Sequence, residues 1–289
     1  MLTRLLLLLV RLICLLPLQL LAPIGQCLGM VLYFLGRERR KVARINLERC
    51  FPEWAPALRR QVLQAHFRAA GRALLEQGIL WWSSKERIER TVGIEDAQHL
   101  QAAHGKPIIV LAFHFLGVEM GNIRLSTRYR GVSVFANQKN PVFRDLLQRS
   151  RTRFGNSLLL SRQDGIRPVI KAMREGRTLL YLPDQDFGPK DAIFSPFFGV
   201  PAATVTGLSR LARLTGACVI PFVTRQLPGG QGYVGRFYPA WDNYPGEGVE
   251  ADTLRMNQFL EQRVLEMPEQ YFWMHKRFKT RPPGEDSPY

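Results

Sequence analysis

The sequence lacks the common motifs by which enzymes hold a metal ion or a nucleophile. It has only four cysteines, Cys14, Cys27, Cys50 and Cys218, with no CxxC pair among them. This pattern argues against a zinc site or a disulfide framework and is typical of free thiols on a reducing side of a membrane. HExxH and GxSxG motifs are absent as well. We therefore predict no metal, no cofactor and no covalent enzyme nucleophile.

Acidic residues are scarce relative to basic ones. The 289 residues include 40 Lys and Arg but 24 Asp and Glu, which gives a net charge of +16. Such a surplus favours anionic partners, namely nucleic acid, a phospholipid surface, or an acidic protein or substrate, and the charge alone does not choose among them. An apolar content of 46% without low-complexity tracts or solenoid repeats is typical of a globular protein, and we predict one such domain.

Charge is missing altogether from Leu12 to Leu35, a run of 24 residues. About 20 helical residues cross a hydrocarbon core, and the run exceeds a usual signal-peptide core. Pro17, Pro23 and Gly25 interrupt it, so it forms either one kinked span or two half-helices within one leaflet. Basic residues follow at once, which indicates the cytoplasmic side. We predict a membrane anchor over residues 1–36 and a cytoplasmic-face domain over residues 37–289.

Helix and strand patterns alternate beyond the anchor. We expect helices over 39–50, 56–80, 95–103, 141–154, 166–175, 204–215 and 252–267. Strands are expected over 107–113, 132–136, 157–161, 178–182, 217–224 and 233–240. Residues 86–91 are expected to form a connecting strand or loop, and residues 183–201 a loop. This alternation predicts an α/β sheet with helices on its faces.

The stretch PIIVLAFHFLGVEMGN, residues 107–122, carries the first chemical signal. Its apolar run predicts a buried strand that ends at His114, on the edge where open α/β sheets bind ligands. Glu119 then falls in the first turn of a helix, from which its carboxylate can reach back to the ring. A carboxylate on one ring nitrogen raises the basicity of the other, which suits a general base. The alternative is that His114 lies at a strand end and Glu119 at a helix start without any functional relation, since this arrangement gives the same spacing.

Polar residues follow two further predicted strands. Asn137 and Lys139 precede an Arg-rich helix that carries Arg144 and Arg151, and such groups suit a phosphate or a developing oxyanion. A solvated basic helix face also explains these arginines. In YLPDQDFG, Asp184 and the neighbouring Asp186 would share the sheet edge of His114, where carboxylates orient an arginine or bind sugar hydroxyls. A turn capped by carboxylates is the alternative.

Two aromatic segments lie further along the chain. The Phe-rich stretch 194–204 suits either an apolar wall for a fatty chain or a loop packed over the core. The segment PEQYFWMHKRFKTRP, residues 268–282, interleaves aromatic and basic residues, a pattern found in nucleic-acid sites and on anionic membranes. Because an anchor is predicted, we favour the membrane and expect no nucleic acid.

Five ordered blocks resemble the lipid A late acyltransferase family, within the wider glycerolipid acyltransferases. HFLGVE has the pattern of a His, four residues and an acid, and the other blocks are RRKVARINLERCFPEW, LPDQDFG, FFGVPAAT and PEQYFWMHKRF. The resemblance covers nearly the whole chain. It implies a glycerolipid-acyltransferase-like fold, a mixed α/β sheet flanked by helices with an N-terminal membrane-anchoring helix.

The resemblance also implies an activity. It indicates an inner-membrane enzyme of Gram-negative bacteria that moves an acyl chain from acyl carrier protein to a hydroxyl of a Kdo-lipid IVA type lipid A precursor. By position in the family pattern, His114 is the base, Glu119 orients it and Arg151 is the essential arginine. Residues expected at the substrate are Asn137, Lys139, Arg144, Asp184 and Asp186.

Two other functions fit parts of the sequence. An acyltransferase of the same fold could act on another lipid, such as glycerol phosphate or an aminolipid, although the FFGVPAAT and PEQYFWMHKRF blocks favour lipid A. A basic, membrane-tethered binding module would explain the charge but leave His114 and Glu119 without a role.

Overall fold

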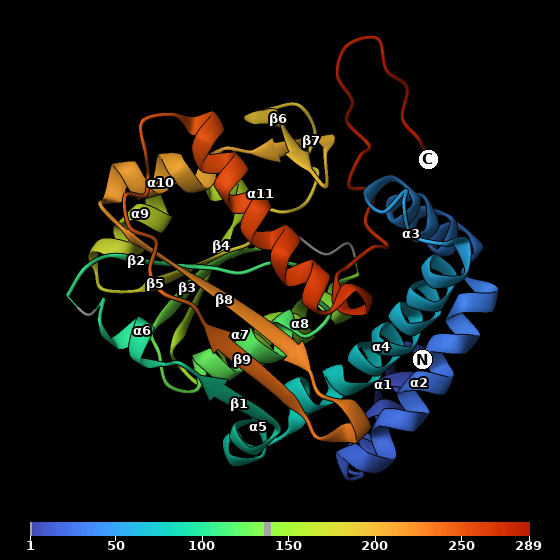
Figure 1. Ribbon diagram of the computed structural model, residues 1–289. Helices are drawn as coiled ribbons and strands as arrows, with labels where there is room; N and C mark the ends of the chain where they lie inside the picture. Colours follow the sequence, from blue (N-terminus) through green and yellow to red (C-terminus); the bar gives the residue numbers. More distant parts are fainter. Residues whose placement is uncertain (1, 104, 136–139) are drawn as a thin grey trace.

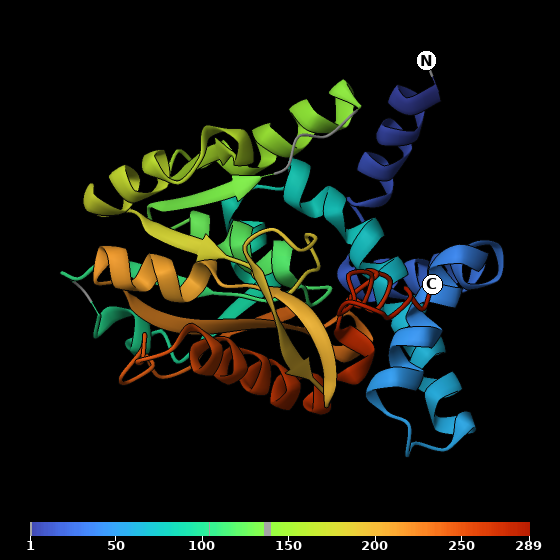
Figure 2. The same ribbon diagram turned by 90° about the horizontal axis from the view of Figure 1, so that it is seen from above.

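The N-terminal part of the chain is helical (Figure 1; Figure 2). The computed structural model describes residues 2–103, 105–135 and 140–289, with only the backbone at residues 2–4, 6, 141 and 143. The first helices are α1 (Leu2–Ile13), α2 (Leu18–Leu35), α3 (Arg37–Cys50) and α4 (Pro56–Trp82). The helices predicted over 39–50 and 56–80 are confirmed as α3 and α4.

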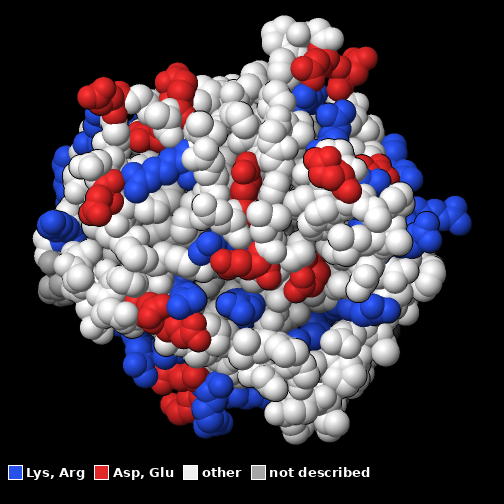
Figure 3. Space-filling model, viewed as in Figure 1, with Lys and Arg blue, Asp and Glu red and all other residues white. Residues whose placement is uncertain are grey.

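The charge-free run is broken once, before α2. Pro17 precedes this helix with an extended backbone, at φ −59° and ψ 149°, whereas Pro23 lies inside the helix. Helix α2 is long and apolar enough to cross a membrane. Its side chains at Val31, Phe34 and Leu35 are exposed, and the surface over α2, at the lower right of Figure 3, carries few charges. The molecule therefore presents an apolar surface suited to a membrane.

Helix α2 packs closely along α4 through glycines. A Cβ added to Gly29 would lie 2.1 Å from the carbonyl oxygen of Phe67, and one added to Gly71 would lie 2.3 Å from that of Gly25. Gly25 and Gly29 form a small-xxx-small pattern, which lets two helix backbones approach closely. The larger helix of the predicted anchor is therefore fixed against the domain that follows it.

Seven described strands form one mixed sheet, in the order β1-β9-β8-β2-β5-β3-β4. They are β1 (Val92–Glu95), β2 (Ile108–Leu111), β3 (Gly131–Phe135), β4 (Ser157–Ser161), β5 (Thr178–Tyr181), β8 (Cys218–Gln226) and β9 (Tyr233–Phe237). Neighbouring strands are parallel except β8 and β9, which are antiparallel. This confirms the predicted mixed α/β sheet.

Helices cover both faces of the sheet (Figure 1). Ile109 and Leu111 of β2 pack on the side of α9 (Arg167–Arg174), α10 (Gly207–Thr215) and α11 (Val249–Glu266). Val110 packs on the opposite side, near α6 (Gln98–Gln101) and α7 (Val118–Ser126). Because alternate side chains are buried on both faces, β2 is a continuous apolar run in the sequence.

The remaining elements lie at the edges of this core. Helix α8 (Pro141–Thr152) packs beside β4 and α7. Short 3₁₀ turns span Arg162–Asp164, Pro228–Gly230 and Pro268–Gln270.

Two predictions were wrong. Residues 86–91, expected as a connecting strand or loop, lie in helix α5 (Lys85–Thr91), whose N-cap Ser84 accepts a hydrogen bond from the backbone of Arg87. The expected loop before residue 201 contains an antiparallel hairpin, β6 (Ala192–Phe197) and β7 (Val200–Val205). Its turn residues Phe198 and Gly199 have positive φ, as a tight hairpin requires. Prolines are tolerated here because both strands of a two-stranded sheet are edges.

Candidate active site

His114 and Asp184 meet at the carboxyl edge of the sheet. His114 follows β2 and Asp184 follows β5, and these strands lie side by side in parallel. The ring Nδ1 of His114 lies 2.7 Å from Oδ1 of Asp184, and the backbone N–H of His114 donates to Oδ2 at 2.9 Å. One carboxylate therefore holds both the ring and the main chain of the histidine.

This carboxylate also sets the proton affinity of the ring. Burial by itself lowers the pKa of His114, but the charge and hydrogen bond of Asp184, with a contribution from the charge of Glu119, outweigh it and raise the pKa above 6.5. Burial likewise raises the pKa of Asp184, and the His114 interactions reverse this, so that its net pKa is lowered. The side chain of His114 is 26% exposed, while that of Asp184 is fully buried. With Nδ1 held by Asp184, Nε2 is the nitrogen left to exchange a proton.

Glu119 lies in the first turn of α7, as predicted, but its carboxylate binds Arg151 of α8. Oε1 accepts from Nη2 at 2.5 Å and Oε2 from Nε at 3.3 Å, which is a bidentate pair. The ring partner that we expected to be Glu119 is thus Asp184 in the structure. The physical reason is that the neighbouring strand delivers Asp184 directly to the backbone and ring of His114.

Close packing on the sheet fixes the helix that carries Glu119. A Cβ added to Gly121 would lie 2.1 Å from Oγ1 of Thr224 in β8, and one added to Gly117 would lie 3.1 Å from the carbonyl oxygen of the same threonine. At Gly121 a Cβ would overlap Thr224, so this glycine lets α7 sit so near β8, whereas the contact at Gly117 is tight but less severe. The close approach at Gly121 therefore helps to set the position of α7 and of the Glu119 carboxylate on its first turn.

The segment that begins at Pro268 clamps the loop after β2. The backbone N–H of Leu116 donates to the carbonyl oxygen of Gln270 at 2.8 Å, and that of Phe272 donates to the carbonyl oxygen of His114 at 3.0 Å. Gln270 is itself fixed, because its side chain accepts from the backbone N–H of Gln226 and donates to its carbonyl oxygen. Part of the predicted membrane-binding segment thus supports the active-site loop.

Asp186 holds the same C-terminal segment. Its carboxylate accepts hydrogen bonds from the backbone and hydroxyl of Thr280, and its backbone N–H donates to Nε2 of His275. Asp184 and Asp186 are 0% and 3% exposed. In the structure these two carboxylates make internal contacts that position His114 and the chain beside it. Their contacts with the substrate stay a prediction.

The remaining predicted substrate residues lie on or before α8. Arg144 is exposed on that helix, with Nε 3.5 Å from Oδ1 of Asp145. Its role at the substrate stays a prediction. Asn137 and Lys139 lie outside the described residues.

The chain matches, over residues 1–280, the family model described as bacterial lipid A biosynthesis acyltransferase. It is 36% identical over 278 residues to a lipid A biosynthesis lauroyltransferase of Escherichia coli K12, covering 95% of this chain and 90% of that protein. It is 34% identical over 275 residues to a myristoyltransferase of the same organism, covering 92% and 83%. The crystal structure of the 1-acyl-sn-glycerophosphate acyltransferase PlsC of Thermotoga maritima matches with a TM-score of 0.41 and 16% identity, covering 86% of this chain and 96% of that chain. Since the family match spans nearly its whole length, the chain belongs to the bacterial lipid A biosynthesis acyltransferase family and is an O-acyltransferase.

Proposed function

We propose that this enzyme transfers a fatty acyl chain from acyl-acyl carrier protein to a hydroxyl of a Kdo-lipid IVA type lipid A precursor. The observation that carries the proposal is the His114–Asp184 pair, 2.7 Å apart, which leaves ring Nε2 for the substrate. Family membership supplies the lipid A acceptor class. The acidic carrier protein and the phosphorylated acceptor agree with the net charge of +16.

The reaction proceeds by general base catalysis. Nε2 of His114 takes the proton of the acceptor hydroxyl as its oxygen attacks the thioester carbonyl carbon. The tetrahedral intermediate then collapses, the C–S bond breaks, and the carrier thiol leaves with the proton from the imidazolium. Asp184 stabilises that imidazolium, in agreement with the raised pKa of His114.

Arg151 and Glu119 supply the second part of the mechanism. The guanidinium of Arg151 donates to the developing oxyanion or to an acceptor phosphate, and its bidentate bond with Glu119 fixes its direction. Glu119 also adds negative charge near the imidazolium. In this proposal Glu119 supports the base through charge and through Arg151, while Asp184 orients the ring.

Direct transfer, without an acyl-enzyme, agrees with the low reactivity expected of two thiols, the buried Cys50 and the partly buried Cys218. The thiolate is the reactive form of cysteine. Burial raises the pKa of Cys50 and of Cys218, so neither is an activated nucleophile.

We place the enzyme at the cytoplasmic face of the bacterial inner membrane. Helix α2 is apolar enough to span or enter the bilayer. The basic residues of α3 follow it directly, in agreement with the positive-inside rule.

Mass spectrometry of lipid A tests the proposal. A strain lacking its late acyltransferases is complemented with the intact chain, with His114→Ala, or with the control His99→Ala on α6. We expect one acyl increment with the intact chain and the control, and none with His114→Ala. An increment of equal abundance with His114→Ala, at equal membrane levels of protein, would refute the assigned base.

A further inference from the structure

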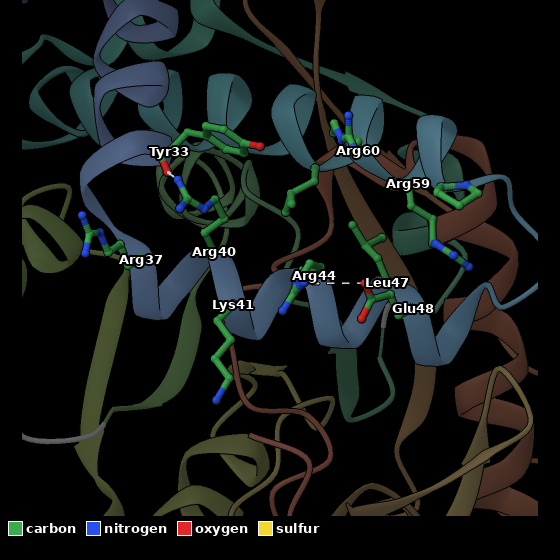
Figure 4. A pocket seen from close by; sticks show the side chains of 11 residues that line it. Tyr33, Arg37, Arg40, Lys41, Arg44, Leu47, Glu48, Arg59 and Arg60 are labelled. Atoms are coloured by element: carbon green, nitrogen blue, oxygen red, sulfur yellow. Dashed lines mark hydrogen bonds and ion pairs between the residues drawn. The ribbon is translucent and has the colours of Figure 1, made fainter.

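A basic pocket lies where α2, α3 and α4 meet, and all its lining residues are outside the active-site set described above. Its volume is about 460 Å³, within the range of small-ligand sites. Side chains of α3 and α4 line it, and Tyr33 near the end of α2 lies beside them (Figure 4). Glu48 is the one acid in the lining, against six cations: Arg37, Arg40, Lys41, Arg44, Arg59 and Arg60.

Some of these cations are already used within the fold. Arg40 donates to the carbonyl oxygen of Tyr33 at the end of α2, and Arg59 donates to those of Phe51 and Pro52. Within the residues that the structure describes, the side chains of Arg37 and Arg60 have neither a hydrogen bond nor an ion pair. These two guanidiniums come from different helices, so the pocket offers positive charge from α3 and from α4 to an anion.

The pocket lies where the apolar surface ends. Phe34 and Leu35, the last residues of α2, are 63% and 75% exposed, and Arg37 follows two residues later. A lipid whose acyl chains lie along α2 would carry its phosphate at the level of Arg37. Juxtamembrane cations at this depth attract anionic lipids.

The pocket is also preformed. The glycine contacts of α2 with α4 hold these two helices at a fixed separation, and α3 continues from α2 after Gly36 alone. We infer that the pocket binds the anionic phosphodiester head group of a bilayer phospholipid and thereby seats the enzyme against the membrane beside α2. This is a binding function apart from acyl transfer, and it can fail while the proposed reaction stands.

The test is a binding measurement on the full chain in detergent. The probes are short-chain dihexanoylphosphatidylglycerol, its phosphatidylcholine counterpart and inorganic phosphate, titrated by calorimetry below the critical micelle concentration. The pocket variant is Arg37→Ala with Arg60→Ala. The matched control is Arg130→Ala with Arg174→Ala, which removes the same charge at two exposed sites outside the pocket.

We expect saturable binding of phosphatidylglycerol to the intact chain and to the control, and binding about 30-fold weaker in the pocket variant. Phosphatidylcholine should bind far more weakly to all three. The paired substitutions Arg37→Lys and Arg60→Lys should retain affinity within a few-fold, because the point charges remain. Equal affinity of the pocket variant and the control would overturn the inference, as would equal binding of phosphatidylcholine. Inorganic phosphate binding as tightly as the lipid would make this a free-phosphate site instead.

Discussion

Two histidines of this enzyme show how environment decides the role of the same side chain. His114 stands at the end of β2, partly exposed, with a carboxylate on Nδ1. His66 is fully buried in α4, where Nδ1 bonds the carbonyl oxygen of Glu269 at 3.0 Å. A carboxylate favours the charged ring, whereas burial against a neutral carbonyl disfavours it.

The two rings therefore have opposite proton affinities. Asp184 and Glu119 overcome burial to raise the pKa of His114. At His66, burial outweighs the hydrogen bond to Glu269 and lowers the pKa to about 4. His114 has a carboxylate partner and a partly exposed side chain, which is the environment expected of a histidine that exchanges protons near neutral pH. His66 is a neutral ring that joins α4 to the segment that begins at Pro268, through its bond to the carbonyl oxygen of Glu269.

Replacing the two histidines should have very different effects on catalysis. His114→Gln removes the proposed base and should lower the rate of acyl transfer by roughly 10²- to 10⁴-fold. His66→Asn keeps a donor for the Glu269 carbonyl and should leave the rate within a few-fold. Initial rates with acyl carrier protein donor in detergent measure both. A His114→Gln enzyme that kept more than a tenth of the activity would remove the distinction between the rings.

Removing the charge of Asp184 should make the environment of His114 more like that of His66. Asp184→Asn should lower kcat/KM by about 100-fold, because the imidazolium loses its counter-charge. Since Asp184 raises the pKa of His114, its loss should move the ascending limb of the pH profile to lower pH. A pH profile of kcat/KM measures both effects. A limb that stayed in place or moved to higher pH would show that another group controls the titration.

The sequence alone could predict one half of this site. The apolar run before His114 is local, so the strand and its polar end were predictable, and β4 over Ser157–Ser161 was predicted to the residue. The bond to Asp184 was not predictable, because it depends on β5 lying beside β2, and strand order is set by packing far along the chain. The local signal was an acid shortly after the predicted strand, with Leu182 and Pro183 between β5 and Asp184.

The hairpin and the bidentate pair escaped prediction for similar reasons. Prolines at positions 196 and 201 argue against strands unless both strands are edges, which only the three-dimensional structure shows. Glu119 has the right spacing to reach His114, but the arrival of α8 offers it a guanidinium with two donors. A charged side chain takes the best partner that the fold provides.

Replacing Glu119 should shift the pH profile of kcat/KM less than replacing Asp184. Glu119→Gln removes only a through-space charge from His114, so the pH limb should move in the same direction by less, with a rate loss of about tenfold. Arg151→Lys is the matched change on the partner. Lysine keeps the positive charge but cannot donate the two parallel hydrogen bonds of the guanidinium. The substitution should therefore lower the rate without moving the ascending limb of the pH profile to lower pH. A larger shift from Glu119→Gln than from Asp184→Asn would make Glu119 the principal partner of the ring.

The smallest expected effect is on stability in acid, where His66 and His114 should act with opposite signs. Because the folded pKa of His66, about 4, lies below its unfolded value near 6.5, the unfolded state gains a proton first as the pH falls. His66 should therefore contribute a loss of about 1 kcal/mol of stability between pH 7 and pH 5.5. His114 has a raised pKa, so its contribution is fully present below pH 6.5 and is lost as the pH rises through the folded value.

Thermal unfolding midpoints in detergent over this pH range measure the difference. His66→Asn should flatten the acid loss relative to the intact chain, and His114→Gln should steepen it. His275, whose pKa burial also lowers to about 4, keeps part of the slope in both variants. His99→Asn on α6 controls for removing a histidine as such. The contradicting result would be a His66→Asn variant whose unfolding midpoint falls with pH as steeply as that of the intact chain and of His99→Asn. Acid stability would then not depend on the buried ring of His66, and the two histidines would differ in catalysis alone.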